Sequence, residues 1–339
     1  MPRVSPRLRK RKIMQEKQCE TPPDGKDLLT FPVPDAFDGM RLDQCLVHFC
    51  PDRSRSRLQT LIKDKHVFLD GKEITQPKSP VRKGMILSVE NIPDQMPPTR
   101  AQGEKIPLDI LYEDDCMLVI NKPPDMVVHP AAGNWSGTVV NALLGREKLL
   151  QEELLSESDP LRPGIVHRLD KDTSGCLAIA KTPFALAKLS EAFAQRTTSK
   201  TYCAILRGHP EVLSGEIRNS IARHKTDRKK MAITKEGGKE AHTAYQIVRK
   251  GFIDRIPACV AHIRIFTGRT HQIRVHMASL GHPVAGDLLY GTNRKLPAPR
   301  QMLHAWKLPL PHPLTGKELS LEAPLPEDFR QMLAEMKEN

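Results

Sequence analysis

The spacing of apolar residues predicts a small folded unit near the N-terminus. Apolar positions recur at helical spacing in two segments: Leu42, Leu46 and Phe49, then Leu58, Leu61 and Ile62. Ser54 is a plausible N-cap for the second helix, and 67–69 and 86–89 are apolar runs typical of strands, with a tight turn at Asp70–Gly71. We therefore predict a compact α/β unit of two helices and a few strands within residues 26–92.

Residues 106–335 show a different pattern, in which short apolar runs dominate. The runs that predict strands span 117–120, 126–128, 164–166, 177–180, 202–206 and 260–265. Helical patterns cover 138–155 and 183–196. Strands outnumber helices and are spaced too irregularly for repeated βαβ units, which predicts an α+β domain on a mixed, largely antiparallel sheet with flanking helices and loops. The proline-containing stretch 93–105 predicts a linker between the two units.

Positive charge is abundant and clustered. The formal net charge of the 339 residues is +12 and the sequence pI is about 9.4, which favours a polyanionic partner such as RNA. Residues 1–25 begin with seven Lys or Arg against one Glu by position 17, and predict a disordered basic tail. The candidate RNA-binding residues are Arg41, Arg53, Arg55, Arg57 and Lys63 in the first unit, with Arg223 and Lys225 in the second. The run 223–230 predicts either a mobile loop that contacts phosphate or a solvated hairpin tip.

Other common classes of protein are disfavoured. The seven cysteines are scattered without a CxxC pair, and His271 and His276 miss the HExxH spacing, so we assign no metal and expect reduced thiols in a cytoplasmic protein. No apolar stretch reaches the roughly 18–20 residues of a membrane span. The segment 281–286 has P-loop spacing but continues with Asp287 instead of Lys, and 133–137 misplaces its serine for a nucleophile elbow. We therefore expect no cofactor.

Two polar segments beside predicted strands are the candidates for chemistry. The first, 167–175, places Asp170 in a turn between apolar runs, although such turns also collect Asp, Ser and Gly for local hydrogen bonds alone. The second, 267–276, offers Arg274 as a partner for a carboxylate. Such a pair would favour the ionised form that a nucleophile or base requires.

Four motifs taken together resemble the RluA-type pseudouridine synthases. They are NKPPDMVVHP at 121–130, HRLDKDTSG at 167–175, KTY at 200–202 and TGRTHQIRVHMASLGHPVAGDLLYG at 267–291. The likeness covers nearly all of 106–320 with order and spacing intact. In the first unit, RLDQCL, SRSRLQTLIKDKHVFLDGK and VRKGM resemble an S4 RNA-binding domain. This combination is similar to the subgroup that modifies large-subunit ribosomal RNA.

The resemblance implies a role for each matching residue. Asp170 corresponds to the catalytic aspartate, and Arg274 to its basic partner. Arg168 corresponds to the arginine that fills the space left by a flipped uridine, and Tyr202 to the tyrosine that stacks on the flipped base. His129 is expected to support substrate binding and to take no chemical part, or else to be a hydrogen-bonded structural histidine.

The implied reaction breaks the C1′–N1 bond of uridine and joins C5 to C1′, without redox change or external energy. A carboxylate at Asp170 could attack C1′ or remove the 2′ proton, and the sequence does not choose between them. Asp172 lies too close along the same turn to be a second catalytic carboxylate, and Asp287 and Tyr290 are expected to be structural. We expect a monomeric 23S rRNA enzyme without an obligate protein partner. A tRNA enzyme and a non-catalytic RNA-binding or ribosome-assembly factor are the alternatives.

Overall fold

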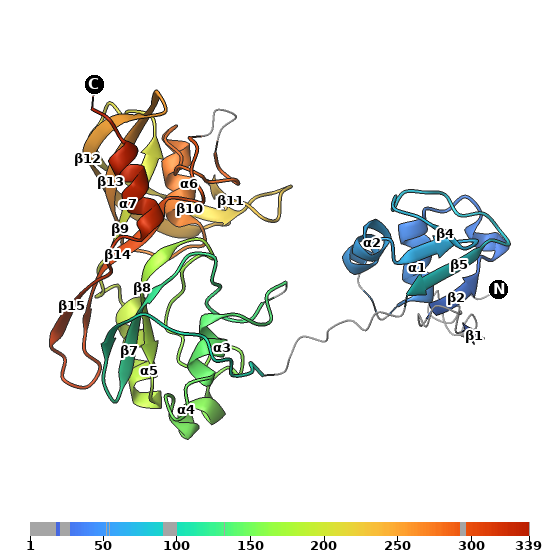
Figure 1. The fold of residues 1–339 in the computed structure, drawn as a ribbon, viewed down its shortest axis with the longest axis horizontal. Coiled ribbons are helices and arrows are strands. Elements are labelled where there is room, and N and C mark those ends of the chain that lie inside the picture. The colour runs from blue at the N-terminus through green and yellow to red at the C-terminus, as the bar shows by residue number, and fades with distance from the viewer. Residues whose placement is uncertain are drawn as a thin grey trace, which may run out of the picture. The chain divides into compact units, whose positions relative to one another are not determined.

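The computed structural model describes residues 18–20, 28–51, 53, 55–90, 100–131, 133–291 and 296–338, and of 18–20, 56 and 57 the backbone alone. The chain divides into two compact units, Met1–Met96 and Pro97–Asn339, which are described separately (Figure 1). The predicted N-cap Ser54 and most of the predicted basic tail lie outside the described residues. One part of that tail is ordered: Gln18–Glu20 pair with Leu28–Pro32 as a strand.

The smaller unit is a five-stranded antiparallel sheet with two helices. Along the sheet the strands are β1 (Gln18–Glu20), β2 (Leu28–Pro32), β5 (Ile86–Glu90), β3 (Val67–Leu69) and β4 (Lys72–Glu73), and the helices are α1 (Leu42–Phe49) and α2 (Arg55–Lys63), with a 3-10 turn at Asp35–Phe37. The apolar faces predicted for both helices are buried in one core. The predicted turn at Asp70–Gly71 joins β3 to β4, and both residues have positive φ.

A buried carboxylate joins the two helices of this unit. The side chain of Asp43 is 0% exposed. Arg41 donates to both of its oxygens at 3.0 Å, Arg55 donates at 2.8 Å and Gln59 at 2.6 Å. Burial by itself would raise the pKa of Asp43, but these hydrogen bonds outweigh it and hold that pKa well below its usual range.

The larger unit is built on a ten-stranded sheet. Its strands along the sheet are β11 (Met231–Thr234), β10 (Ser214–Arg223), β12 (Lys239–Ile253), β13 (Ile256–Ile265), β9 (Lys200–Arg207), β14 (Leu303–Pro311), β8 (Ser174–Ala180), β7 (Met117–Lys122) and β6 (Ile110–Glu113), and β15 (Glu318–Glu322) pairs with β14. Only the β14–β8 pairing is parallel among those of the described residues. The predicted α+β class and the mixed, largely antiparallel sheet are confirmed.

Five helices accompany this sheet in the described part of the chain. They are α3 (Val139–Leu144), α4 (Glu152–Glu157), α5 (Pro183–Ala194), α6 (Gln272–Ser279) and α7 (Glu327–Glu335). The predicted helix at 183–196 is confirmed as α5. None of the helices that the structure describes is both long and apolar enough to cross a membrane.

Three sequence predictions for the larger unit were wrong in detail. The helical pattern at 138–155 is two short helices, because α3 ends at Gly145, where a Cβ would lie 1.9 Å from the carbonyl oxygen of Glu104. Residues 126–128 are not a strand: the carbonyl groups of 127 and 128 accept the first N–H groups of α3. Residues 164–166 make only one isolated bridge, at Ile165.

The predicted linker 93–105 ends earlier than its composition indicated. Residues 91–99 lie outside the described residues, but 100–105 belong to the larger unit. Ala101 N–H donates to the carbonyl of Pro160, and Glu104 N–H donates to the carbonyl of Asn141. The Asn141 side chain in turn donates to the carbonyl of Gln102 at 2.7 Å. These bonds attach the end of the predicted linker to α3 and to the segment that follows α4.

Candidate active site

The turn that carries Asp170 is held by bonds from distant parts of the chain. Its backbone closes with Thr173 N–H donating to the carbonyl of Asp170 at 3.1 Å, immediately before β8 begins. Lys122, which is 0% exposed, donates to the carbonyl groups of Pro123, Met126 and Lys171 at 2.7, 2.8 and 3.0 Å. One ammonium group therefore uses all three hydrogens to join the 121–130 motif to the 167–175 motif.

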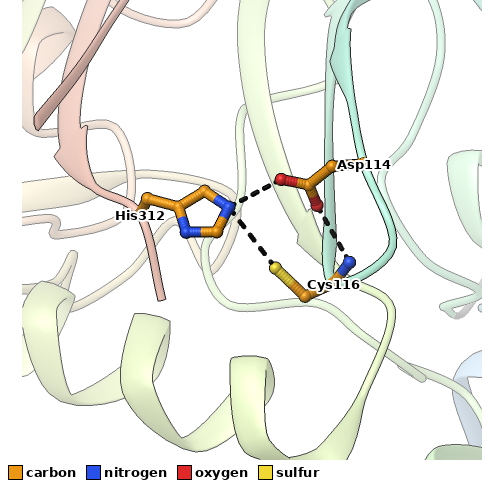
Figure 2. A group of neighbouring side chains, drawn as sticks. All are labelled: Asp114, Cys116 and His312. Carbon is orange, nitrogen blue, oxygen red and sulfur yellow. Dashed lines mark hydrogen bonds and ion pairs between the residues drawn. The ribbon is translucent and has the colours of Figure 1, made fainter. Parts of the chain in front are cut away.

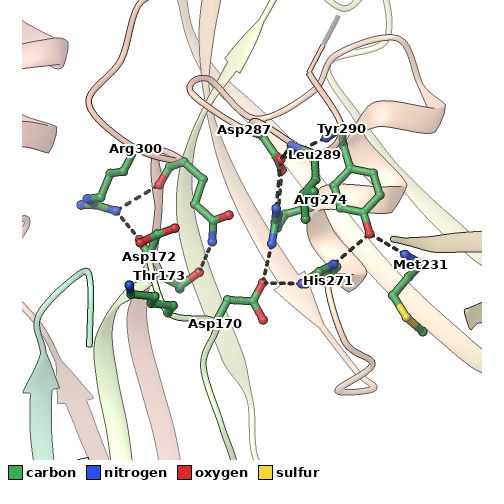
Figure 3. A network of polar contacts seen from close by, with 12 residues as sticks. Asp170, Asp172, Thr173, Met231, His271, Arg274, Asp287, Leu289, Tyr290 and Arg300 are labelled. Atoms are coloured by element: carbon green, nitrogen blue, oxygen red, sulfur yellow. Dashed lines mark hydrogen bonds and ion pairs between the residues drawn. The ribbon is translucent and has the colours of Figure 1, made fainter. Parts of the chain in front are cut away.

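On its other side, the turn is anchored to the segment before β14. Arg300 donates to the carbonyl of Asp172 at 2.9 Å, and Gln301 donates to the hydroxyl of Thr173 at 2.9 Å (Figure 3). Arg300 is itself paired with Asp328 at 2.6 Å. The backbone on both sides of Asp170 is thus fixed, which allows its carboxylate to be placed accurately.

Arg274 bridges two aspartates and meets Asp170 as predicted. Its Nε and Nη2 bind Asp287 at 2.6 and 3.0 Å, and its Nη1 donates to Oδ2 of Asp170 at 3.0 Å (Figure 3). Burial alone would raise the pKa of Asp287, but the bonds from Arg274 outweigh it and the net shift is downward. Asp287 is therefore ionised and fixes the plane of the Arg274 guanidinium with two hydrogen bonds. Because that guanidinium also binds Asp170, the position of Asp170 is fixed as well.

The two oxygens of Asp170 are in different surroundings. Oδ2 accepts from Arg274 and lies 3.8 Å from Nε2 of His271. Among the described residues, none forms a hydrogen bond with Oδ1. With the side chain 20% exposed, this oxygen is available to a molecule that enters the site.

His271 connects Asp170 to a neighbouring hairpin. It adopts the left-handed backbone conformation (φ 55°) directly before α6. Oη of Tyr290 accepts from the backbone N–H of Met231 at 2.7 Å and lies 2.8 Å from Nδ1 of His271. The tyrosine hydrogen is thus directed to Nδ1, which leaves the ring proton on Nε2, facing Asp170. Burial lowers the pKa of His271, so this ring is neutral near pH 7.

Two cavities meet at Asp170. The first, about 470 Å³, is lined by Tyr202, and we call it the tyrosine cavity. The second, about 590 Å³, is lined by His129, and we call it the histidine cavity. Both also share Arg168, Leu169, Asp170, His271 and Arg274 in their walls.

The residues predicted to handle the base lie around these cavities. Tyr202 is 7% exposed on β9, and burial raises the pKa of its hydroxyl, which no described residue hydrogen-bonds. Arg168 is exposed and has no hydrogen-bond or ion-pair partner among the residues that the structure describes. His129 is 9% exposed, and its Nδ1 lies 3.1 Å from the carbonyl oxygen of Pro130.

The predicted RNA-binding residues of the smaller unit are not equivalent. Arg53 was predicted to be a surface cation for RNA, but it is only 8% exposed and precedes α2, so its side chain lies in the interior. Arg41 and Arg55 are half-exposed and bind Asp43. Lys63 is exposed, whereas the side chain of Arg57 lies outside the described residues.

In the larger unit, Arg223 and Lys225 lie where β10 turns into β11. Both are exposed, and Arg223 donates to the carbonyl of Arg228 across the turn. The basic run 223–230 is therefore the tip of an antiparallel hairpin, one of the two forms predicted for it.

A group of potential metal ligands lies elsewhere in the larger unit. Nε2 of His312 is 2.6 Å from Asp114 and 3.5 Å from Sγ of Cys116 (Figure 2). Nδ1 of His312 accepts the N–H groups of Leu314 and Thr315 at 3.2 and 3.1 Å, which places the ring proton on Nε2. A metal at Nε2 would then require an imidazolate. Burial and Asp114 also raise the pKa of Cys116 to about 11, so this group fits a hydrogen-bonded cluster better than a metal site.

Comparisons with known proteins define the class. The family model for RNA pseudouridylate synthase matches residues 116–279, and the S4 domain model matches residues 40–87. The chain belongs to the RNA pseudouridylate synthase family, and the predicted class of enzyme and the predicted S4 domain are confirmed.

Particular relatives match most of the chain. Ribosomal large subunit pseudouridine synthase D of Nitrosomonas europaea is 42% identical over 91% of this chain and 88% of its own length. The protein of the same name from Escherichia coli K12 is 39% identical over 88% of this chain and 91% of its own. The solved structure of human RNA pseudouridylate synthase domain containing 1 has a TM-score of 0.54 and 30% identity, over 66% of this chain and 85% of that chain.

Sequence reasoning missed three contributors to the site. Asp287 and Tyr290 were considered structural, and Lys122 was not singled out. All three lie inside the motifs that carried the family resemblance, so their position in those motifs was the available signal. Their contacts with Arg274, His271 and Lys171 span 13, 19 and 49 residues, and only the fold reveals them.

Proposed function

We propose that Asp170 is the catalytic group of this RNA pseudouridine synthase and that Oδ1 is its reacting oxygen. The observation that carries this proposal is the asymmetry of the carboxylate: Oδ2 is bound by a clamped arginine, while Oδ1 is unpartnered among the described residues and the side chain lines both cavities. A positioned, ionised oxygen serves both open routes, attack at C1′ and removal of the 2′ proton.

The neighbouring residues fit the remaining steps of the reaction. The base must leave its stack, which costs a few kcal/mol. Tyr202 supplies a ring surface beside Asp170 for the extruded base. The guanidinium of Arg168, which no described residue binds, can enter the vacated position. When C1′–N1 breaks and C5–C1′ forms, C5 loses its proton and N1 gains one, so the isomerisation is balanced without a co-substrate.

Large-subunit ribosomal RNA is the substrate that we propose. The relatives that match about nine-tenths of the chain are named for it, and the S4 domain adds an RNA-binding module. Exposed Lys63 and the hairpin cations Arg223 and Lys225 would contact phosphate. We further propose that the enzyme acts as a monomer in the cytoplasm. A tRNA substrate is the alternative.

The test is pseudouridine mapping of ribosomal RNA from cells that lack this protein. We expect one or more large-subunit pseudouridines to disappear, to return with the wild-type gene, and to stay absent with Asp170→Asn. Loss of a tRNA pseudouridine instead would identify the alternative substrate. Full restoration by Asp170→Asn would reject the catalytic assignment, although the family membership would stand.

A further inference from the structure

The tyrosine cavity carries more positive charge than its known partners neutralise. Its lining includes five cations, Arg168, Arg196, Lys200, Arg269 and Arg274, and Asp170 is the one acidic side chain among the described lining residues. Arg274 is neutralised by Asp170 and Asp287, and Arg196 pairs with Glu240 at 3.0 Å. Three cations are left: Arg168, Lys200 and Arg269.

Lys200 is the least expected of the three. It is partly buried, its Nζ lies 5.1 Å from the centre of the Phe193 ring, and no hydrogen bond or ion pair to it is found in the described part of the chain. Burial, assisted by the like charge of Arg269, lowers the pKa of Lys200. The charged form of Lys200 is therefore less stable in the fold than in water, and the Phe193 ring is the one partner that its ammonium has among the described residues.

Arg269 faces the same space and is also incompletely bonded. Its Nε donates to the carbonyl of Glu240 at 2.9 Å, whereas its two terminal nitrogens have no partner among the described residues. The backbone of Gly268 brings this loop close to Lys200, since a Cβ there would lie 3.7 Å from Nζ. Lys200 and Arg269 therefore lie near enough for each charge to act on the other, and the nearby Glu240 carboxylate forms its ion pair with Arg196.

The position along β9 relates this pair to the base site. Lys200 and Tyr202 are two residues apart, so they project from the same face of the strand, about 7 Å apart. That separation is comparable to the distance between a nucleobase and the phosphate of its own nucleotide. A base on Tyr202 would carry a phosphate into reach of Lys200.

We propose that Lys200 and Arg269 form a binding site for a phosphodiester group of the RNA, at or next to the nucleotide whose base enters the tyrosine cavity. This site rests on the proposed function, and it adds a backbone contact to the base and ribose contacts. An anion bound there balances two like charges that form no ion pair with any described residue. The contact draws the backbone toward the cavity and so favours the extruded nucleotide.

The first test removes the charge and keeps the side-chain volume. We would compare full-length Lys200→Met with wild type on a synthetic RNA stem-loop that carries the uridine identified by mapping. KM should rise roughly 10-fold to 100-fold, as expected for a lost charge-assisted hydrogen bond. The single-turnover rate at saturating RNA should change less than about threefold, and the slope of log affinity against log salt should fall by about 1.

The matched control and the melting temperature separate binding from folding. Lys250→Met removes an exposed lysine from β12 and should change neither KM nor the salt slope. Lys200→Met should melt at the same temperature as wild type or higher, because a destabilised charge is removed. A lower melting temperature with unchanged KM would show a structural lysine and overturn the proposal. Arg269→Gln is a second variant, expected to raise KM in the same way.

A chemical substitution in the RNA tests the partner directly. Uncharged methylphosphonate linkages are placed on the 5′ or the 3′ side of the target uridine. At one of the two positions, the uncharged linkage should weaken RNA binding by wild type about tenfold and leave RNA binding by Lys200→Met unchanged. If the loss of affinity from the linkage and the loss from Lys200→Met multiply at both positions, the two changes act independently and Lys200 does not bind these phosphates. Absence of any pseudouridine with wild type would contradict the proposed function instead.

Discussion

Each unit contains an aspartate surrounded by arginine, and the two differ in how much of the carboxylate is satisfied. Asp43 in the smaller unit is 0% exposed, and both of its oxygens accept hydrogen bonds from Arg41, Arg55 or Gln59. Asp170 in the larger unit is 20% exposed, and Arg274 binds only one of its oxygens.

The comparison shows that an ion pair does not by itself mark a reactive group. Asp43 is buried with both oxygens bonded, so substrate cannot reach it, and its hydrogen bonds to Arg55 and Gln59 hold α1 against α2. Asp170 keeps one oxygen open, and the arginine that holds it is fixed from behind by Asp287. Arg274 fixes the position of Asp170 through Oδ2 alone, which leaves Oδ1 available for reaction.

The largest expected effect among the arginines is that of Arg274→Lys. Lysine keeps the charge but cannot bind two carboxylates in one plane, so Asp170 should lose its position. We expect the single-turnover rate of tritium release from RNA labelled at C5 of uridine to fall about 100-fold. Arg55→Lys, the matched change beside Asp43, should leave that rate unchanged. A comparable loss in both variants would abolish the distinction between the two aspartates.

Asp43→Ala tests the opposite side of the comparison. Removal of a buried carboxylate that accepts several charged hydrogen bonds should lower the free energy of unfolding of the smaller unit by about 2 kcal/mol. Hydrogen exchange of α1 and α2 in the full chain measures this, with exposed Asp64→Ala as the control. Undiminished protection would contradict a structural role for Asp43.

The family resemblance was sufficient to single out Asp170 and Arg274, which the structure brings into contact. Asp170 and Arg274 lie 104 residues apart, and only the resemblance brought them together before the structure did. The sheet class was equally accessible, because short continuous apolar runs predict buried strands independently of their neighbours.

Features that depend on contacts distant in sequence were not accessible. The break between α3 and α4 follows from the chain that packs against Gly145, and 126–128 is kept out of the sheet by the backbone bonds that begin α3. Arg53 appeared as an exposed cation because periodicity cannot tell a helix from the bend before it. The order that Asp287 imposes on Arg274 is likewise invisible in a linear pattern.

Acid should affect the two units at different pH. Burial lowers the pKa of His276 to about 4, whereas the unfolded chain takes up that proton near pH 6.5. The unfolded state binds more protons between these values, so stability of the larger unit should fall by about 1 kcal/mol per pH unit as pH drops through this window. The pKa of Asp43 is lowered in the fold, so its contribution to the stability of the smaller unit is lost only when the pH falls below about 4.

Tryptophan fluorescence can follow this difference, because the two tryptophans, Trp135 and Trp306, both lie in the larger unit. Urea unfolding should show a lower midpoint at pH 5 than at pH 7, and His276→Gln should reduce the difference. Hydrogen exchange in α1, corrected for its intrinsic pH dependence, should show little change in stability over the same range. Equal losses in both units would remove this part of the comparison.

The smallest expected effect is that of Tyr290→Phe. The variant keeps the ring but removes the hydroxyl that orients His271 toward Asp170. Since one neutral hydrogen bond contributes about 1 kcal/mol, we expect a loss of roughly fivefold in single-turnover rate with little change in RNA affinity. An unchanged rate would show that His271 does not help to position Asp170.

The central claim is that Asp170 reacts and Asp43 does not, and one measurement addresses it directly. Full-length Asp170→Asn and Asp43→Asn are compared in single-turnover tritium release from large-subunit ribosomal RNA labelled at C5 of uridine. We predict that Asp170→Asn binds the RNA with an affinity within about threefold of wild type but releases tritium more than about 1,000-fold more slowly. At saturating RNA, Asp43→Asn should release tritium at the wild-type rate. Release by Asp170→Asn within tenfold of the wild-type rate would contradict the account.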